Sequence, residues 1–107
     1  MNPKMKSLLG LARRAGKLVI GDEGVMKAVR AKKAVLVLIA SDASAGTLKR
    51  YQDKCAFYGT ELVTAGDRAV LGQAIGRAEQ VVLAVVDKGF ADGIRSAREY
   101  TEVQSIE

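Results

Sequence analysis

The chain has no histidine, and it has one cysteine and one proline among 107 residues. Without histidine, it lacks the side chain most often used for proton transfer at neutral pH and the usual zinc ligand sets. Cys55 alone cannot form an internal disulfide. These absences predict a protein that carries no metal and no cofactor, and they argue against an enzyme.

Long hydrophobic runs are also missing. No apolar segment approaches the roughly 20 residues that a membrane span needs. The apolar start of the chain is interrupted by Arg13 and Arg14, too early for a signal peptide. We therefore expect a cytoplasmic protein that has no membrane partner.

The balance of charge is uneven along the chain. Hydrophobic residues make up 49% and charged residues 27%, which is typical of one globular domain over residues 1–107. The net charge is +5, but residues 1–33 carry nine Lys or Arg and two acids, whereas the remaining 74 residues have a net charge of −2. Such a basic block suits a polyanion partner, although cations on helix faces can also serve solubility alone.

Apolar residues alternate between helical spacing and continuous runs, which predicts helices alternating with strands. Two of the strands have no polar face, so helices must cover both sides of the sheet. The sequence therefore predicts an α/β fold, a three-layer α/β/α sandwich with about four strands. The expected strands are 17–20, 34–40, 60–65 and 81–86, and the expected helices are 4–15, 22–33, a helix from the "SDAS" segment to Tyr58, 68–76 and 90–100.

Local signals set several of these boundaries. Asp22 and Asp67 are predicted N-caps, and Gly16 and Gly76 are predicted to end helices. The last residues, "TEVQSIE", are expected to be frayed.

The segment "GLARRAGKLVIGDEG", residues 10–24, is rich in glycine and could be taken for a nucleotide-binding P-loop. That motif needs four residues between its glycines and a Ser or Thr after its lysine. Here five residues separate Gly10 from Gly16, and Leu18 follows Lys17. The sequence therefore excludes a P-loop.

The end of this segment is a predicted strand, a glycine turn and a helix start. Gly21 and Gly24 have no Cβ, and the first turn of a helix has unpaired N–H groups, so a phosphate or an RNA backbone could approach closely. Lys17 and Lys27 flank the turn. Asp22 and Glu23 would repel phosphate but could accept hydrogen bonds from bases. The alternative is that these acids only cap the helix.

Two stretches carry a family resemblance. "IGDEGVMKAVRAKKAVLVLIASDAS" and "RAVLGQAIGRAEQVVLAVVDKGFA" resemble the ribosomal L7Ae/L30e family, whose members bind kink-turn RNA. The likeness extends from about residue 5 to about residue 95 and is strongest to the small bacterial YlxQ-like branch. The resemblance implies a mixed four-stranded sheet. It also implies a non-catalytic, ribosome-associated protein whose helix near Gly21 docks into kinked RNA beside tandem sheared G·A pairs.

The resemblance also assigns roles. Gly21 would be the glycine of close approach, Lys27 would bind the RNA backbone, and the loop from Gly76 to Gln80 would lie near the base extruded at the kink. At the position of Glu23, relatives commonly carry Asn or Lys. At the position of Gly24, they carry Glu or Gln. These departures bear on the affinity for RNA and on which RNA is preferred. The predicted RNA-binding residues are Lys17, Gly21, Asp22, Glu23, Gly24, Lys27, Arg30, Gly76, Arg77, Ala78 and Glu79.

Other residues have simpler interpretations. Cys55 is expected to be a small buried or half-buried side chain, and Tyr51, Phe57 and Tyr58 are expected to pack rather than to stack on bases. The main hypothesis is a monomeric protein that binds structured RNA and not DNA. Two other hypotheses remain open. The chain could be an enzyme or a small-ligand protein that binds phosphate at the Gly21 turn, or an adaptor whose basic face meets an acidic protein.

Overall fold

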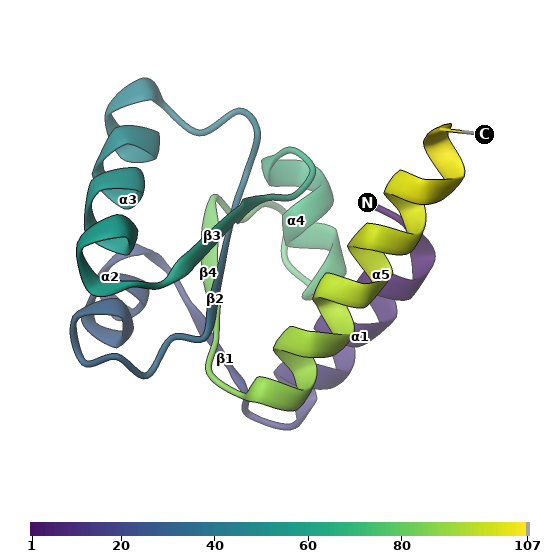
Figure 1. Cartoon of the computed structure of the whole chain (residues 1–107), viewed down its shortest axis with the longest axis horizontal. Helices are drawn as coiled ribbons and strands as arrows, with labels where there is room; N and C mark the ends of the chain where they lie inside the picture. Colours follow the sequence, from purple (N-terminus) through teal and green to yellow (C-terminus); the bar gives the residue numbers. More distant parts are fainter. Residues whose placement is uncertain (107) are drawn as a thin grey trace.

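The computed structural model describes the backbone of residues 1–106 and the side chains of residues 1–98. Helices and strands alternate along the chain, as Figure 1 shows. The strands are β1 (Leu18–Ile20), β2 (Leu36–Ile39), β3 (Glu61–Thr64) and β4 (Val82–Val85). The helices are α1 (Pro3–Arg14), α2 (Asp22–Arg30), α3 (Ala45–Tyr58), α4 (Arg68–Ala74) and α5 (Lys88–Ile106).

The four strands form one sheet in the order β1-β4-β2-β3. β2 and β3 are parallel, whereas β4 runs antiparallel to both of its neighbours, β1 and β2. Helices α2 and α3 lie on one side of the sheet and α1, α4 and α5 on the other (Figure 1). The mixed sheet and the three-layer α/β/α architecture are therefore confirmed.

The two central strands explain the continuous apolar runs of the sequence. All residues of β2 and β4 are buried, and neighbours along each strand point to opposite faces. Each face packs against its own helices, so the sheet separates two hydrophobic clusters. Leu36, Leu38, Leu83 and Val85 belong to the cluster with α1, α4 and α5, and Val37, Ile39, Val82 and Ala84 to the cluster with α2 and α3.

The helices begin in two different ways. Side chains of Asn2, Ser44 and Asp67 cap α1, α3 and α4. Helix α2 has Gly21 as its N-cap residue, with no side-chain hydrogen bond. The prediction that Asp22 caps α2 is therefore wrong, because Asp22 is the first helical residue and its carboxylate is bonded to α3 instead.

Other local predictions have mixed outcomes. Gly16 and Gly76 follow helices with φ of 71° and 75°, as expected for helix-ending glycines. Helix α5 continues past the predicted end at Tyr100, into the segment expected to be frayed, where the sequence has neither glycine nor proline to end it. Cys55 and Tyr51 are buried as predicted, but Phe57 is 79% exposed and contacts the edge of Tyr58.

Candidate nucleic-acid interface

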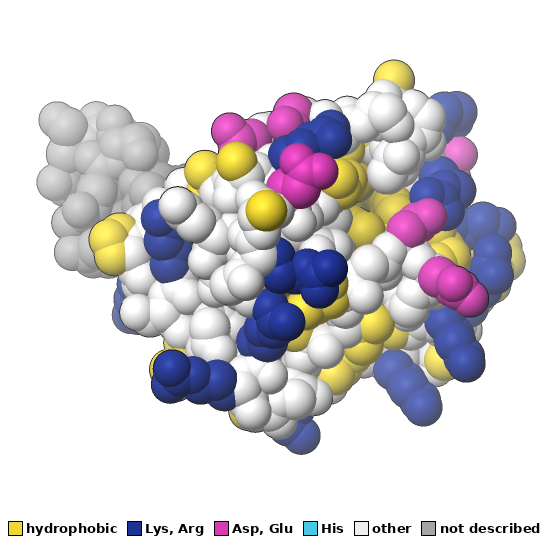
Figure 2. Space-filling view, turned by 180° about the vertical axis from the view of Figure 1, so that it is seen from behind, with side chains coloured by type: hydrophobic (Ala, Val, Ile, Leu, Met, Phe, Trp, Pro, Cys, Tyr) yellow, Lys and Arg dark blue, Asp and Glu magenta, His cyan; other side chains and the backbone are white. Residues whose placement is uncertain are grey.

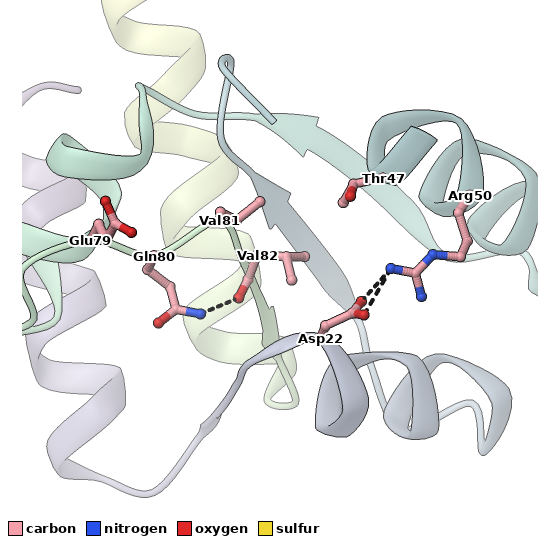
Figure 3. A pocket seen from close by; sticks show the side chains of 7 residues that line it. All are labelled: Asp22, Thr47, Arg50, Glu79, Gln80, Val81 and Val82. Carbon is pink, nitrogen blue, oxygen red and sulfur yellow. Dashed lines mark hydrogen bonds and ion pairs between the residues drawn. The ribbon is translucent and has the colours of Figure 1, made fainter. Parts of the chain in front are cut away.

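The Gly21 turn and the loop between α4 and β4 meet at one end of the sheet. Ile20 pairs with Leu83, and the backbone N–H of Gly21 donates to the carbonyl of Val82 at 3.5 Å. Beside this contact is a hollow of about 280 Å³ between α2, α3 and the loop (Figure 3). It is lined by Asp22, Thr47, Arg50, Glu79, Gln80, Val81 and Val82. The fold thus brings together two of the segments for which the family resemblance implied RNA contact.

Gly21 has a backbone conformation that other residues rarely adopt. Its φ is 97° and its ψ is 152°, a region occupied almost only by glycine. A Cβ built on Gly21 would meet no heavy atom within 4 Å, so the space around the turn is open. Helix α2 has no side-chain cap, so no capping side chain satisfies the N–H groups of its first turn. The geometry leaves room for the close approach expected at Gly21.

Gly24 also has a packing role that the sequence did not indicate. A Cβ on Gly24 would lie 2.9 Å from Cγ1 of Val19 on β1. The missing side chain therefore lets α2 pack closely against β1. This packing also gives a physical reason why a longer residue is not found at Gly24. Contact between its backbone and RNA stays a prediction.

The loop after α4 is held by a close backbone approach. A Cβ on Gly72 would lie 2.4 Å from Cα of Glu79, so only glycine lets the returning loop cross α4 there. The N–H of Arg77 donates to the carbonyl of Gly72, and the N–H of Gln80 to that of Arg68, both at 2.9 Å. The glycine of the "LGQAIG" segment therefore positions the loop of residues 76–80.

Arg13 adds a contact to this loop that the sequence did not indicate. Its guanidinium donates to the backbone carbonyl of Ile75, which links the end of α1 to the end of α4. Nη1 of Arg13 is 3.9 Å from the position that a Cβ on Gly76 would take. One of the early cations therefore lies beside the predicted RNA-binding loop.

Asp22 is bonded to two residues of α3 that sequence reasoning missed. Nη2 of Arg50 lies 2.8 Å from each carboxylate oxygen, and the Tyr51 hydroxyl donates to Oδ1 at 2.5 Å. The hydrogen bond from Arg50, with a second from Tyr51, lowers the pKa of Asp22. Burial and the Asp22 hydrogen bond raise the pKa of Tyr51. Arg50 and Asp22 are 28 residues apart, so no local spacing in the sequence could reveal the pair.

The remaining predicted RNA-binding residues are exposed, but they do not all lie near the Gly21 turn. Glu23 and Lys27 on α2 are exposed, and so is Arg30 at its end. Gly76, Arg77, Ala78 and Glu79 are exposed in the loop. Lys17 precedes β1 and its carbonyl accepts from Val86, so it lies at the opposite end of that strand from Gly21. The fold does not bring Lys17 to the turn.

The nine early cations do not form one continuous patch. Lys4 and Lys6 lie in the first half of α1, whereas Lys32 and Lys33 follow the end of α2. Figure 2 shows Lys and Arg side chains at many places on one face of the molecule, with hydrophobic, neutral and acidic surface between them. The basic block of the sequence is therefore spread over several elements of the structure.

Two negative observations concern the described part of the chain. No three Cys, Asp or Glu side chains there lie close enough together to hold a metal ion. None of the helices in that part combines the length and the apolar character that crossing a bilayer requires.

The sequence profile of the ribosomal protein L7Ae/L30e/S12e/Gadd45 family matches residues 3–94. The chain is 47% identical over 89 residues to a Bacillus subtilis protein named RNA-binding protein YlxQ, which covers 83% of this chain and 89% of the relative.

Two solved structures share the fold. A protein of unknown function from Bacillus halodurans superposes with a TM-score of 0.84 at 43% identity, covering 89% of this chain and 96% of the other. The Giardia lamblia 15.5kD RNA binding protein has a TM-score of 0.76 at 20% identity, covering 96% and 92%. From the profile match and the shared identity we conclude that this chain belongs to the ribosomal protein L7Ae/L30e/S12e/Gadd45 family.

Proposed function

We propose that this protein is a non-catalytic RNA-binding protein that recognises kink-turn or similarly kinked RNA. The observation that carries the proposal is the open, uncapped helix start at Gly21, which lies beside the loop that Gly72 holds in place. The proposal is supported by the family and by the B. subtilis relative, whose name describes it as an RNA-binding protein. The ribosomal proteins of the family make ribosomal RNA a candidate ligand.

The chemistry of the turn suits RNA. Backbone N–H groups at a helix start favour phosphate oxygens, and they also suit the acceptor oxygen of a 2′-hydroxyl. Proteins recognise RNA mainly at bulges, loops and other sites where bases leave regular stacking, because the major groove of a regular RNA helix is too narrow to read. An open turn with a hollow beside it fits such a site better than it fits duplex DNA.

The experiment that tests this function compares two hairpins. We expect the protein to bind a kink-turn hairpin at least about tenfold more tightly than the same hairpin with its G·A pairs replaced by Watson–Crick pairs, since each lost specific contact costs about 1–3 kcal/mol. Fluorescence anisotropy at several salt concentrations measures both affinities and their salt dependence. Equal affinity for the two hairpins would contradict recognition of the kink. Absence of binding to either would favour a small anion or an acidic protein as the partner.

Lys27→Ala tests the backbone contact predicted for α2. Lys27 is exposed on α2, and loss of one phosphate contact should reduce the slope of log K against log salt by about one unit. Lys33→Ala is the matched control, because Lys33 is also exposed and follows α2 toward the start of β2, away from the Gly21 turn. An unchanged slope for Lys27→Ala, or an equal decrease for the control, would remove Lys27 from the interface.

A further inference from the structure

The hollow beside the Gly21 turn has an unfavourable charge for an RNA site. Its lining includes two acids, Asp22 and Glu79, and a single cation, Arg50. Asp22 is also the first residue of α2, where an RNA phosphate would be attracted by the helix start. An unpaired carboxylate at that place would repel the ligand that the fold otherwise favours.

Arg50 is held against this carboxylate from two sides. Its Nη2 contacts both oxygens of Asp22, and its guanidinium carbon lies 5.3 Å from the centroid of the Tyr51 ring. Figure 3 shows the side chains of Arg50 and Asp22 pointing toward each other at one side of the hollow, with Glu79 and Gln80 at the other. Both side chains are partly exposed, 43% and 54%, so the pair sits at the surface that RNA would reach.

Tyr51 holds the Asp22 carboxylate in place through its hydroxyl group. The ring is fully buried, with 0% exposure, and its hydroxyl also lies 3.1 Å from the backbone oxygen of Asp22. The hydroxyl and the guanidinium therefore orient the carboxylate toward α3. A buried aromatic anchor of this kind loses little conformational entropy when the site forms, because its side chain is already ordered.

We propose that Arg50 is a positioning residue for RNA binding, which neutralises the Asp22 carboxylate and turns it toward α3 so that the RNA backbone can approach Gly21. This inference rests on the proposed function. Within the described residues, Arg50 is the one cation that forms an ion pair with Asp22. Without Arg50, the lining of the hollow would carry two acids and no cation.

A double-mutant cycle in the full chain tests the inference. The probe is the kink-turn hairpin, and the variants are Arg50→Gln, Asp22→Asn and the combination of both. We expect Arg50→Gln to weaken binding by roughly fivefold to tenfold. This is the size of effect expected when an unpaired carboxylate lies within a few ångströms of an RNA phosphate. In this proposal the Asp22 carboxylate faces α3 and does not accept from RNA bases. Asp22→Asn, which removes the repelling charge, should therefore increase affinity. The double variant should bind within about twofold of the native protein, because the repelling charge is gone.

Lys49→Gln is the matched control for the loss of one positive charge on α3. Lys49 precedes Arg50 directly, is 76% exposed and pairs with Asp53 instead of Asp22. We expect its effect on affinity to be less than twofold. Thermal unfolding of every variant, followed by circular dichroism, identifies any variant that is weakened simply because it is not folded at the assay temperature.

The other outcomes overturn the inference in distinct ways. If the double variant binds as weakly as Arg50→Gln, Arg50 contacts RNA directly and does not act through Asp22. If all three variants are equally weak, the network only supports the fold. If Arg50→Gln binds like the native protein, Arg50 has no role in binding. In each case the native protein still discriminates between the two hairpins, whereas its failure to do so would contradict the proposed function itself.

Discussion

Gly72→Ala should lower the free energy of unfolding by about 2 kcal/mol and displace the loop of residues 76–80. The added Cβ would lie 2.4 Å from Cα of Glu79 and 2.7 Å from its backbone N and C atoms. Backbone atoms cannot move aside as a flexible side chain can, and overpacking of this kind costs about 1–3 kcal/mol. Alanine recovers part of this cost through its better helix propensity. Urea unfolding of the two proteins measures the difference.

Gly46→Ala is the matched control for Gly72→Ala. Gly46 also lies in a helix, α3, but a Cβ there would meet nothing within 4 Å. Alanine should therefore stabilise the protein by up to about 1 kcal/mol. Gly72→Ala should lower the free energy of unfolding, whereas Gly46→Ala should raise it. Because both changes add the same side chain to a helix, the difference reports the contact with Glu79. A Gly72→Ala protein as stable as the native one would show that the loop does not approach α4 this closely.

The displaced loop should also weaken RNA binding. The loop lines the hollow beside the Gly21 turn through Glu79 and Gln80, and it is hydrogen-bonded to α4 at Gly72 and Arg68. If the loop contacts RNA, Gly72→Ala should reduce affinity for the kink-turn hairpin at temperatures where the protein remains folded. Unchanged affinity with reduced stability would place the loop outside the interface.

Gly21→Ala has the second large expected effect, on stability and on binding together. A residue with a Cβ at φ 97° and ψ 152° costs about 1–3 kcal/mol of backbone strain. The Cβ would also project into the open space where RNA is proposed to approach. We expect affinity for the kink-turn hairpin to fall by roughly tenfold or more, through steric exclusion and loss of the preferred turn.

Gly59→Ala separates strain from contact. Gly59 ends α3 with φ of 71°, and a Cβ there would also meet nothing within 4 Å. Gly59 precedes the start of β3, where Glu61 pairs with Leu36. The Gly21 turn lies at the opposite end of the sheet, near Ile39 and Val82. Gly59→Ala should therefore cost about 1 kcal/mol of stability and leave RNA binding unchanged. Retained affinity in Gly21→Ala would mean that RNA does not approach this turn.

Much of the fold could be predicted from local patterns. The apolar runs around Leu36–Ile39 and Val82–Val85 predicted two strands buried on both faces, and both strands are fully buried. Asp67 and the "SDAS" segment, which contains Ser44, were recognisable as helix starts. The side chains of Asp67 and Ser44 bond N–H groups three residues ahead, a contact confined to one turn. Such features depend on residues close in sequence, so spacing alone reveals them.

Asp22 shows why the same reasoning fails elsewhere. Its position before an apolar helix is typical of an N-cap, yet Arg50 and Tyr51 compete for its carboxylate from another helix. A charge-assisted bond to Arg50 and a bond to a buried hydroxyl together outweigh one bond to a backbone N–H. The competing partners were 28 and 29 residues away, beyond the reach of any local pattern.

The sequence by itself determined the α/β class, the extent of most elements, the glycine turn at residue 21 and, through its motifs, the family. Only the tertiary structure decided the strand order, the packing of Gly24 on Val19, the approach of Glu79 to Gly72 and the pairing of Asp22 with Arg50. The physical reason is the range of the interactions. Periodicity records which face of an element is buried, but it contains no information on which distant backbone or side chain will occupy the space beside that face.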